Sequence, residues 1–386
     1  METTKYLIVG GGMSAAAAVQ GIRELDADGG IVIVGAEPHP PYKRPLLSKK
    51  LWSGGAEEKL WYDAALGGAD LKTSRRIVAL DLDARRAKDD QGDEYAYEKV
   101  LLATGGTPRR LGGNDGEIVY FRTLDDYRSL RAAAEGGGHV VVIGGGFIGS
   151  ELASSLTGIG AKVTMVFPEA AIGSRILPAD LAAFVTEYYK EKGVEVLAGE
   201  TVKSVDGRSV TLGSGRTLEG DAVVAGLGIV PSTELAEAAG LTVDNGIVVD
   251  EYGRVDARKD VFAAGDVSSF PSIPLGKRVR VEHEDHANAH GRLVGANMAG
   301  ANTPYDHLPF FYSDLFDLGY EAVGDTDPRL TTLEAWEEPN RKGVITYVDD
   351  ERRPRGVLLW DTWGKVDAAR ELIRAGKPVG EAVLLG

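Results

Sequence analysis

Two glycine-rich turns are the features of this sequence whose spacing most clearly indicates a chemistry. The first turn, at residues 10–12, follows the apolar run 5–9, and the second, at residues 144–146, follows the apolar run 139–143. Glycines in such a turn allow the backbone to bend sharply and to approach a phosphate, and the next helix directs its free N–H groups at the negative charge. Each turn is therefore a candidate site for the pyrophosphate of a dinucleotide.

The spacing within the two turns separates them from ordinary connections between a strand and a helix. The first has the pattern G-x-G-x-x-A, and the second has the full pattern G-x-G-x-x-G. One such match is weak, but two matches, each between a strand-like run and a helix-like run, are strong. The residues predicted to contact the dinucleotides are Gly10, Gly12, Met13, Ser14 and Ala15 in the first turn, and Gly144, Gly146, Phe147, Ile148 and Gly149 in the second.

A carboxylate near the end of the second strand of such a unit binds the ribose hydroxyls of the adenosine. Glu169 has this position in the second unit, and Glu37 has it in the first. Because a carboxylate would repel a 2′-phosphate, Glu169 predicts a preference for NADH over NADPH.

The order of apolar runs indicates an α/β fold with two Rossmann-like dinucleotide-binding domains and a small α+β C-terminal domain. The runs at 5–9 and 31–34 flank the first turn as the two strands of a βαβ unit would. The runs at 139–143 and 162–167 flank the second turn in the same way. Further along the chain we expect a helix at about 287–298.

Composition excludes several classes of function. The length of 386 residues exceeds that of one ordinary domain, and the net charge of −15 argues against nucleic acid or an anionic membrane as a partner. The absence of cysteine excludes disulfides, thiolate metal sites and a redox-active Cys-x-x-Cys pair.

No apolar run approaches the roughly 20 residues that span a bilayer. No signal peptide precedes the first strand, so we expect a cytoplasmic protein.

Further segments make the sequence similar to a known family. Residues 41–49 (Pro-Tyr-Lys-Arg-Pro-Leu-Leu-Ser-Lys), 103–109 (Ala-Thr-Gly-Gly-Thr-Pro-Arg) and 265–267 (Gly-Asp-Val) resemble the FAD-dependent pyridine nucleotide-disulfide oxidoreductases. Within this family the chain is most similar to the ferredoxin-reductase branch, which includes apoptosis-inducing factor. The second resemblance depends on residues 167–169 with 176–178, on 280–286 (Arg-Val-Glu-His-Glu-Asp-His), and on 312–314 with 319–321.

The resemblance implies that the first turn binds FAD and the second binds NADH, so that the cofactors are FAD and NAD. It implies that Arg44, Lys49 and Arg109 bind phosphates and ring atoms of FAD, where fixed cations complement negative charge, and that Asp266 accepts hydrogen bonds from the ribityl chain. The other FAD-side positions that it implies are Val78, Ala103, Thr104, Gly105 and Gly265. The domains expected are an FAD-binding domain at 1–112 and 248–305, an NADH-binding domain at 113–247 and a C-terminal domain at 306–386.

Four residues are implied to be catalytic because they would lie where the flavin and the nicotinamide meet. Lys49 would pair with Glu151 beside the flavin and order the place where the nicotinamide stacks. Phe147 would be an aromatic gate over that face, and His283 would lie near the flavin and the nicotinamide amide.

The resemblance also implies residues around this centre. Glu282 would lie beside His283, with Glu321 behind both, and Arg175 and Gly226 would complete the NADH site. Tyr312 would also contact a cofactor. It stands where the family usually has Trp, so the resemblance does not decide how this ring stacks or how an electron acceptor approaches it.

The spacing of His283, His286 and His290 would also place three histidines on one face of a helix, as metal ligands could be. No cysteine supports a metal, and a role beside the flavin accounts better for His283. We therefore predict no metal site.

These observations favour an NADH-dependent flavoprotein reductase that passes hydride from NADH to FAD and electrons onward to an acceptor. The acceptor stays open among ferredoxin, rubredoxin, a quinone and oxygen. Ferredoxins are generally acidic, so this acidic reductase would need a local basic patch to attract one. Arg352, Arg353 and Arg355, together with Lys277 and Arg278, could supply that patch.

A redox sensor is the alternative function. In that case NADH would form a long-lived charge-transfer complex that controls oligomerisation, as the resemblance to apoptosis-inducing factor implies. A fold retained only as a scaffold is disfavoured, because Lys49, Phe147 and Glu151 are all present. The sequence leaves open whether the chain forms a homodimer.

Overall fold

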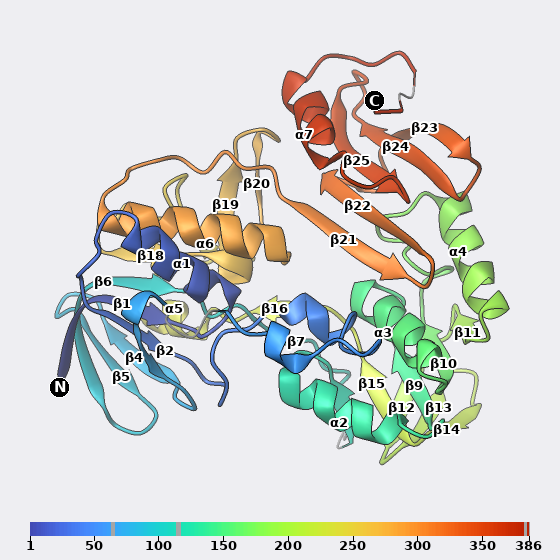
Figure 1. Cartoon of the computed structure of the whole chain (residues 1–386), viewed down its shortest axis with the longest axis horizontal. Helices are drawn as coiled ribbons and strands as arrows, with labels where there is room; N and C mark the ends of the chain where they lie inside the picture. Colours follow the sequence, from blue (N-terminus) through green and yellow to red (C-terminus); the bar gives the residue numbers. More distant parts are fainter. Residues whose placement is uncertain (63–65, 113–116, 382–383, 386) are drawn as a thin grey trace. The chain divides into compact units, whose positions relative to one another are not determined.

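The computed structural model describes residues 1–62, 66–112, 117–381 and 384–385, and Figure 1 follows the chain through its helices and strands. The chain forms two compact units. Unit 1 consists of Met1–Lys43, Glu57–Thr107 and Val230–Pro309, and unit 2 consists of Arg44–Ala56, Pro108–Ile229 and Phe310–Gly386. Residues 113 and 386, which bound two of the expected domains, lie outside the described residues, and the division into three domains stays a prediction.

Unit 1 is built on a mainly parallel sheet with the strand order β3-β2-β1-β6-β5-β4, and β18 also pairs with β6. β1 lies between β2 and β6, so that Leu7 pairs with Val32 on one side and with Val100 on the other. The central strands are short apolar runs, as is typical of parallel strands that are covered on both faces. Their bounds are β1 (Glu2–Val9), β2 (Ile31–Val34), β3 (Asp70–Lys72), β4 (Ile77–Asp81), β5 (Arg86–Asp89), β6 (Glu94–Leu102) and β18 (Val261–Ala263).

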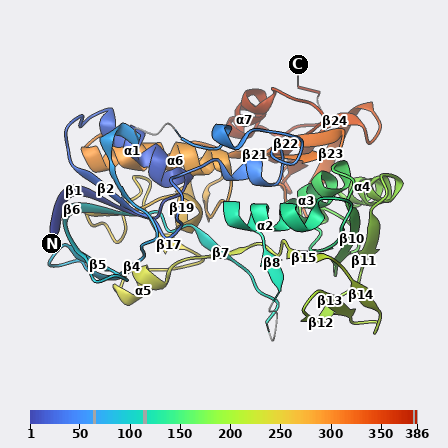
Figure 2. The ribbon, with the colours of Figure 1, turned by 60° about the horizontal axis from the view of Figure 1, so that its bottom comes forward.

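Apolar clusters cover both faces of this sheet, because successive side chains of a strand point to opposite sides. Tyr6 and Ile8 belong to a cluster that includes residues of helices α1 (Met13–Arg23) and α6 (Glu284–Ala299), which lie side by side (Figure 2). Leu7 and Val9 belong to a second cluster. The smaller elements of unit 1 are α5 (Glu234–Ala238), β17 (Ile247–Val248), β19 (Ser268–Ser272), β20 (Lys277–Val279), η2 (Glu57–Lys59), η3 (Leu66–Gly68) and η4 (Gly265–Val267).

The helix expected at about 287–298 begins earlier, at Glu284, and ends at Ala299. Glu284 and Asp285 occupy its first turn, where acidic side chains complement the positive end of the helix dipole. Gly300 ends the helix with φ of 113°, a left-handed conformation that glycine adopts without strain.

Unit 2 contains a second parallel sheet, with the order β11-β10-β9-β15-β8. Val142 of its central strand pairs with Met165 on one side and with Val224 on the other. The strands are β8 (Ile118–Tyr120), β9 (His139–Ile143), β10 (Lys162–Phe167), β11 (Glu195–Ala198) and β15 (Ala222–Ala225), and the helices are α2 (Leu124–Ala134), α3 (Phe147–Gly158) and α4 (Ala179–Glu191). The remaining elements here are η1 (Arg44–Leu47) and the meander β12 (Val202–Asp206), β13 (Ser209–Leu212) and β14 (Thr217–Glu219). The paired strands β7 (Gly106–Pro108) and β16 (Ile229–Pro231) each have two of their three residues in unit 1.

The C-terminal part of unit 2 is an antiparallel sheet with the order β21-β22-β25-β24-β23. Helix α7 (Val366–Ala375) packs on β22 and β25. A two-residue turn, Phe316-Asp317, joins β21 to β22. The strands are β21 (Phe310–Leu315), β22 (Leu318–Gly324), β23 (Thr331–Glu338), β24 (Lys342–Val348) and β25 (Pro354–Trp360).

Helices α1 and α6 of unit 1 approach each other so closely that only glycine fits at the contact. A Cβ at Gly21 would lie 1.9 Å from the carbonyl oxygen of Arg292, and one at Gly295 would lie 2.1 Å from that of Ala18. The approach fixes the position of α1, which begins directly after the first glycine turn.

We expect Gly295→Ala to lower the free energy of unfolding by roughly 1–3 kcal/mol, because the added methyl group forces the two helices apart. Gly158→Ala is the matched control: Gly158 is also helical, and a Cβ there would meet no described atom within 4 Å. Urea unfolding followed by circular dichroism measures both changes. Equal stability of Gly295→Ala and the wild type would contradict the close packing.

Candidate functional site

The first glycine turn lies in unit 1 between β1 and α1. Gly10 has φ of 117°, and a Cβ there would lie 2.1 Å from the carbonyl oxygen of Ala103. Gly12 is the N-cap of α1, without a side-chain hydrogen bond to cap it, and a Cβ at Gly12 would meet no described atom within 4 Å. The free N–H groups at the start of α1 therefore face open space. The backbone beside them, at Gly10, leaves no room for a side chain. This arrangement fits a pyrophosphate.

The turn at Gly265 packs against the start of α1, within unit 1. Gly265 has φ of 76°, and a Cβ there would lie 2.1 Å from Ser14 Oγ. Asp266 follows directly and is half-buried, and its carbonyl oxygen accepts a hydrogen bond from Arg280 Nη1 at 3.2 Å. The structure thus brings the Gly265-Asp266 turn to the segment of Gly10 and Ser14, although more than two hundred residues of chain lie between the two segments.

Glu37 follows β2, and its Oε2 accepts a hydrogen bond from the Tyr42 hydroxyl at 2.6 Å. The carbonyl oxygen of Glu37 accepts a hydrogen bond from the Ser74 amide at 3.0 Å, so the segment that leads to β4 runs beside it. Val78 lies at a register shift of β4, and its side chain is 50% exposed. Thr104 and Gly105 both bond to Ser232: Thr104 Oγ1 donates to its carbonyl oxygen, and the carbonyl oxygen of Gly105 accepts from its amide.

The segment at the start of α6 carries an ion pair and two buried histidines. Glu282 pairs with Arg280 at 2.7 Å, and His283 is the N-cap of the helix. His286 and His290, which follow on α6, are completely buried. In the parts of the chain that the structure describes, no group of histidine and carboxylate side chains could hold a metal ion.

His286 and His290 belong to a packed aromatic cluster with Phe270 and Tyr305. The ring centroids of His286 and Phe270 are 4.6 Å apart, and His286 Nδ1 lies 3.0 Å from the Tyr305 hydroxyl. His290 Nδ1 accepts a hydrogen bond from the Gly265 amide at 3.4 Å, so this histidine supports the turn that precedes Asp266. Burial lowers the pKa of His286 to about 3, and burial lowers the pKa of His290 well below its ordinary value.

The second glycine turn lies in unit 2 between β9 and α3. A Cβ at Gly144 would lie 2.4 Å from the carbonyl oxygen of Gly226, and one at Gly149 would lie 2.0 Å from that of Gly144. Gly146 is the N-cap of α3, again without a side-chain cap, and a Cβ there would meet no described atom within 4 Å. The second turn therefore repeats the geometry of the first, with Gly226 beside Gly144.

Glu169 lies just beyond β10, at the edge of the sheet where the glycine turn also lies. Its Oε1 accepts hydrogen bonds from Arg175 Nε at 3.1 Å and Nη2 at 2.7 Å. The Arg175 side chain is 80% exposed, whereas that of Glu169 is 27% exposed. Both hydrogen bonds from Arg175 go to Oε1 and not to Oε2.

The structure brings Lys49 and Glu151 together in unit 2. Lys49 Nζ bonds to Glu151 Oε1, and the side chains are only 7% and 4% exposed. Lys49 Nζ also lies 4.9 Å from the centre of the Tyr312 ring, so the position that usually holds Trp contacts this cation. Phe147, at the first position of α3, packs edge-on against Phe311, with ring centroids 5.2 Å apart.

Two residues that the sequence analysis did not select also bond to Glu151. Ser48 Oγ donates to Oε2 at 2.6 Å, and Ser313 Oγ donates to Oε1 at 2.7 Å. Both serines lie in segments that carry the family resemblance, residues 41–49 and 312–314. Membership of these segments is the feature of the sequence that could have pointed to them. Their contact with Glu151 could not be seen because 103 and 162 positions separate them from it.

Other predicted residues have contacts within their own unit. Arg44 Nη1 donates to the carbonyl oxygen of Arg122 at 3.0 Å, and the Arg109 side chain is exposed. Glu321 Oε2 accepts a hydrogen bond from the Gly364 amide at 2.9 Å, which ties it to the loop after β25.

Most of the proposed basic patch is occupied by contacts within the chain. Arg353 pairs with Asp349 at 2.9 Å and with Glu351 at 2.8 Å. Arg352 Nε donates to the carbonyl oxygen of Val379, and Arg278 Nη1 donates to that of Val249. These cations are therefore weaker attractors for an acidic partner than the sequence indicates, because their charge is partly neutralised or directed at the backbone.

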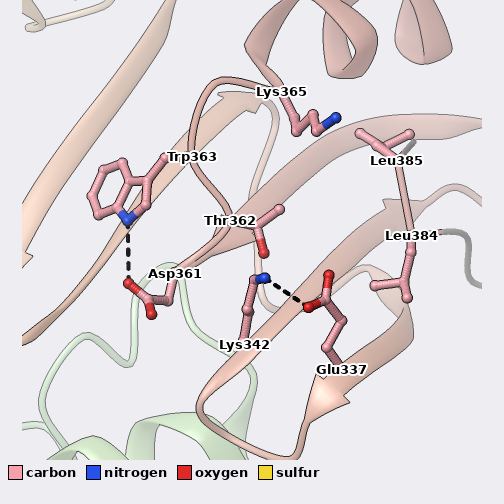
Figure 3. A pocket seen from close by; sticks show the side chains of 8 residues that line it. All are labelled: Glu337, Lys342, Asp361, Thr362, Trp363, Lys365, Leu384 and Leu385. Atoms are coloured by element: carbon pink, nitrogen blue, oxygen red, sulfur yellow. Dashed lines mark hydrogen bonds and ion pairs between the residues drawn. The ribbon is translucent and has the colours of Figure 1, made fainter.

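A hollow of about 560 Å³ lies in the C-terminal part of unit 2 (Figure 3). Trp363, which is 47% exposed, donates its indole N–H to Asp361 at 3.1 Å, and Lys342 pairs with Glu337 at 2.7 Å. As far as the described residues show, its lining shares no residue with either glycine turn or with the Glu151 cluster. The lining residues are Glu337, Lys342, Asp361, Thr362, Trp363, Lys365, Leu384 and Leu385.

Comparison with known families accounts for this pair of turns. Residues 4–291 match the family model described as pyridine nucleotide-disulphide oxidoreductase. The chain belongs to this family. Residues 294–341 match a second model, the C-terminal region of mitochondrion-associated apoptosis-inducing factor. The predicted family, the α/β fold class and the flavoprotein oxidoreductase activity are confirmed, and the chain uses FAD and NAD(H).

Individual relatives cover almost the whole chain. Apoptosis-inducing factor 1, mitochondrial, of Dictyostelium discoideum is 37% identical over 97% of this chain and 79% of that protein. The ferredoxin–NAD(+) reductase component of the anthranilate 1,2-dioxygenase system of Burkholderia cepacia is 34% identical over 97% and 95%. The crystal structure of a covalent putidaredoxin reductase–putidaredoxin complex superposes with a TM-score of 0.91 at 28% identity, over 98% of this chain and 95% of that chain.

None of the helices in the described ranges combines the length and the apolar character that a crossing of the bilayer requires.

We expect acid to destabilise the fold through His286. Its folded-state pKa is lowered from 6.5 to about 3, so the unfolded chain binds a proton that the folded chain does not. Through His286 alone, the free energy of unfolding therefore falls by about 1.4 kcal/mol for each pH unit below about 6.5, until the folded-state pKa is reached. His286→Asn should show a shallower dependence in urea titrations. Phe270→Leu, which loosens the same cluster without removing the titrating ring, should be less stable but keep the wild-type slope, and equal slopes in all three proteins would contradict this origin.

Proposed function

We propose that the chain is an NADH-dependent flavoprotein reductase whose electron acceptor is a small electron-transfer protein of the ferredoxin type. FAD would be held at the turn of Gly10 and NADH at the turn of Gly144. The observation that carries the proposal is the repeated geometry of these turns: each has an uncapped helix start at a glycine with open space in front of it. The acceptor is supported by the relatives, one named as a ferredoxin–NAD(+) reductase component and one solved in a complex with putidaredoxin.

When bound, FAD supplies the chemistry that accepts a hydride and releases its electrons. The residues of this chain bind and orient. The amides at the start of α1 would hold the FAD pyrophosphate, and Asp266 would accept hydrogen bonds from the ribityl chain. The amides at the start of α3 and the Glu169 carboxylate would hold the pyrophosphate and the adenosine ribose of NADH. The chain has no cysteine, so no dithiol can receive the electrons.

Near the hydride transfer, the residues of unit 2 would act through charge and exclusion of water. Lys49 presents a cation whose position is fixed by the buried Glu151 carboxylate, and a fixed charge costs no reorganisation when the electron distribution changes. Phe147 would cover the nicotinamide side and keep water away until NADH displaces it. No nucleophile is required, because alignment of donor and acceptor is the main contribution of the protein.

Stopped-flow reduction of the purified holoenzyme tests this function. We expect NADH to bleach the flavin absorbance within one turnover, and the reduced protein to be reoxidised faster by a ferredoxin than by a quinone or by oxygen. Protein that stays colourless after addition of FAD would contradict the whole proposal. Reoxidation by oxygen at the highest rate would contradict the acceptor only.

A redox sensor is the second candidate, and the match of residues 294–341 to the C-terminal region of apoptosis-inducing factor favours it. In that function NADH would form a long-lived charge-transfer complex that changes the oligomeric state. Mixing the holoenzyme with excess NADH in air separates the candidates. A persistent long-wavelength band with a change in elution volume supports the sensor, and prompt reoxidation without either supports the reductase.

We expect Glu169→Gln to weaken NADH binding about tenfold, because a charged acceptor for the ribose hydroxyls is replaced by a neutral one. The preference for NADH over NADPH should shrink at the same time, since the repulsion of a 2′-phosphate is lost and Arg175 is released from its partner. Titration of both nucleotides measures the two affinities. Glu187→Gln, which removes an exposed carboxylate of the same unit paired with Lys190, should leave both unchanged. An unaltered nucleotide preference in Glu169→Gln would remove Glu169 from the ribose site.

A further inference from the structure

The Glu151 carboxylate is a buried charge that receives donors from two distant parts of the chain. Glu151 lies on α3, four positions after Phe147, and is 4% exposed. Lys49 Nζ and Ser313 Oγ both donate to Oε1, and Ser48 Oγ donates to Oε2. The hydroxyl donors are as buried as the carboxylate: Ser48 is 2% exposed and Ser313 is 0% exposed.

The two serine hydroxyl groups donate hydrogen bonds to Glu151 in addition to the one from Lys49. A buried carboxylate is stable only if both of its oxygens receive hydrogen bonds, because burial removes the water that would otherwise solvate them. Lys49 bonds to one oxygen only, and the hydrogen bond on Oε2 comes from Ser48. Each hydroxyl turns the positive end of its dipole toward the carboxylate and so replaces a water molecule that burial has removed.

Both serines are themselves held in place. The carbonyl oxygen of Ser48 accepts a hydrogen bond from Ser155 Oγ at 2.7 Å, and Ser155 lies one helical turn after Glu151 on α3. Ser313 lies on β21, opposite Tyr320 of β22 in the strand register, and the Tyr320 hydroxyl also contacts it. Ser313 therefore links the antiparallel C-terminal sheet to the ion pair, and Ser48 links the ion pair to the segment that carries Lys49.

We propose that Ser48 and Ser313 are positioning residues for hydride transfer, which hold the Glu151 side chain in place and through it fix the Lys49 ammonium. The proposal rests on the proposed function, because it assigns to Lys49 a role beside the flavin. Neither serine would touch the nicotinamide or the flavin. Each would act through Glu151, and removal of either would leave the buried negative charge less compensated.

Ser313→Ala and Ser48→Ala test the proposal in the holoenzyme, with Ser154→Ala as the matched control. Ser154 Oγ accepts a hydrogen bond from the Phe316 amide at 2.8 Å and so joins α3 to the β21–β22 turn, whereas the donors to the Glu151 carboxylate among the described residues are Ser48, Lys49 and Ser313. Two quantities separate positioning from a general loss of structure. One is the split between the hydride-transfer rate constant and the dissociation constant for NADH, and the other is the flavin midpoint potential, measured against a reference dye without NADH.

We expect each of the two variants to lose about tenfold in the rate of hydride transfer while the dissociation constant for NADH changes less than about twofold. The midpoint potential should become more negative, because a less compensated carboxylate disfavours added electrons nearby. FAD content should equal that of the wild type, and Ser154→Ala should match the wild type in every quantity. If Ser313→Ala fails to fold, Ser48→Ala decides the question alone.

Unchanged rates in the variants, or slower rates with an unchanged midpoint potential, would overturn the proposal. A failure of the proposed function is distinguishable from this result. In that case NADH does not reduce the wild-type flavin at all, and the midpoint potentials, which are measured without NADH, still show whether the serines act on the flavin.

Discussion

Close approach of one backbone to another is the constraint on which this structure depends. At Gly10, Gly144 and Gly149 a Cβ would lie between 2.0 and 2.4 Å from a carbonyl oxygen, so the chain can follow its path only if these side chains are absent. The same constraint governs the contact of α1 with α6 at Gly21 and Gly295. Since α1 begins at the N-cap Gly12, the helix contact and the first glycine turn are parts of one arrangement in unit 1.

The electrostatic organisation of unit 2 follows a different rule. Glu151 is buried with a lysine and two hydroxyl groups, whereas Glu169 is more exposed and pairs with an arginine at the surface. A pair at the surface is screened by water and contributes little to stability, so Glu169 and Arg175 can separate at low cost. The buried group around Glu151 cannot exchange partners at low cost, and it therefore keeps a fixed geometry.

The turn at Asp266 is supported by neutral groups instead. His290 accepts a hydrogen bond from the Gly265 amide, and His286 stacks on Phe270 in a cluster from which water is excluded. Burial keeps the pKa values of both histidines low, so they act near neutral pH as uncharged aromatic residues with one hydrogen-bond acceptor each. The contacts of these two residues with Phe270 and with the Gly265 turn account for their burial on α6.

The sequence by itself determined the two glycine turns, their place between strand and helix, and the carboxylate that follows the second strand of each unit. These features are local: they depend on residues within about thirty positions of one another, and their spacing carries the signal. Resemblance to a family added Lys49, Glu151 and Asp266, whose roles no local pattern reveals.

Only the tertiary structure decided which groups surround these residues. Ser313 reaches Glu151 across 162 positions, and Arg353 attracts an acidic partner less strongly because Asp349 and Glu351 partly neutralise its charge. Helix α6 begins three residues before the predicted start because the acidic first turn, and not an apolar repeat, sets its beginning. Contacts of this kind depend on how strands and helices from distant parts of the chain pack within a unit, and a spacing pattern contains no information about that packing.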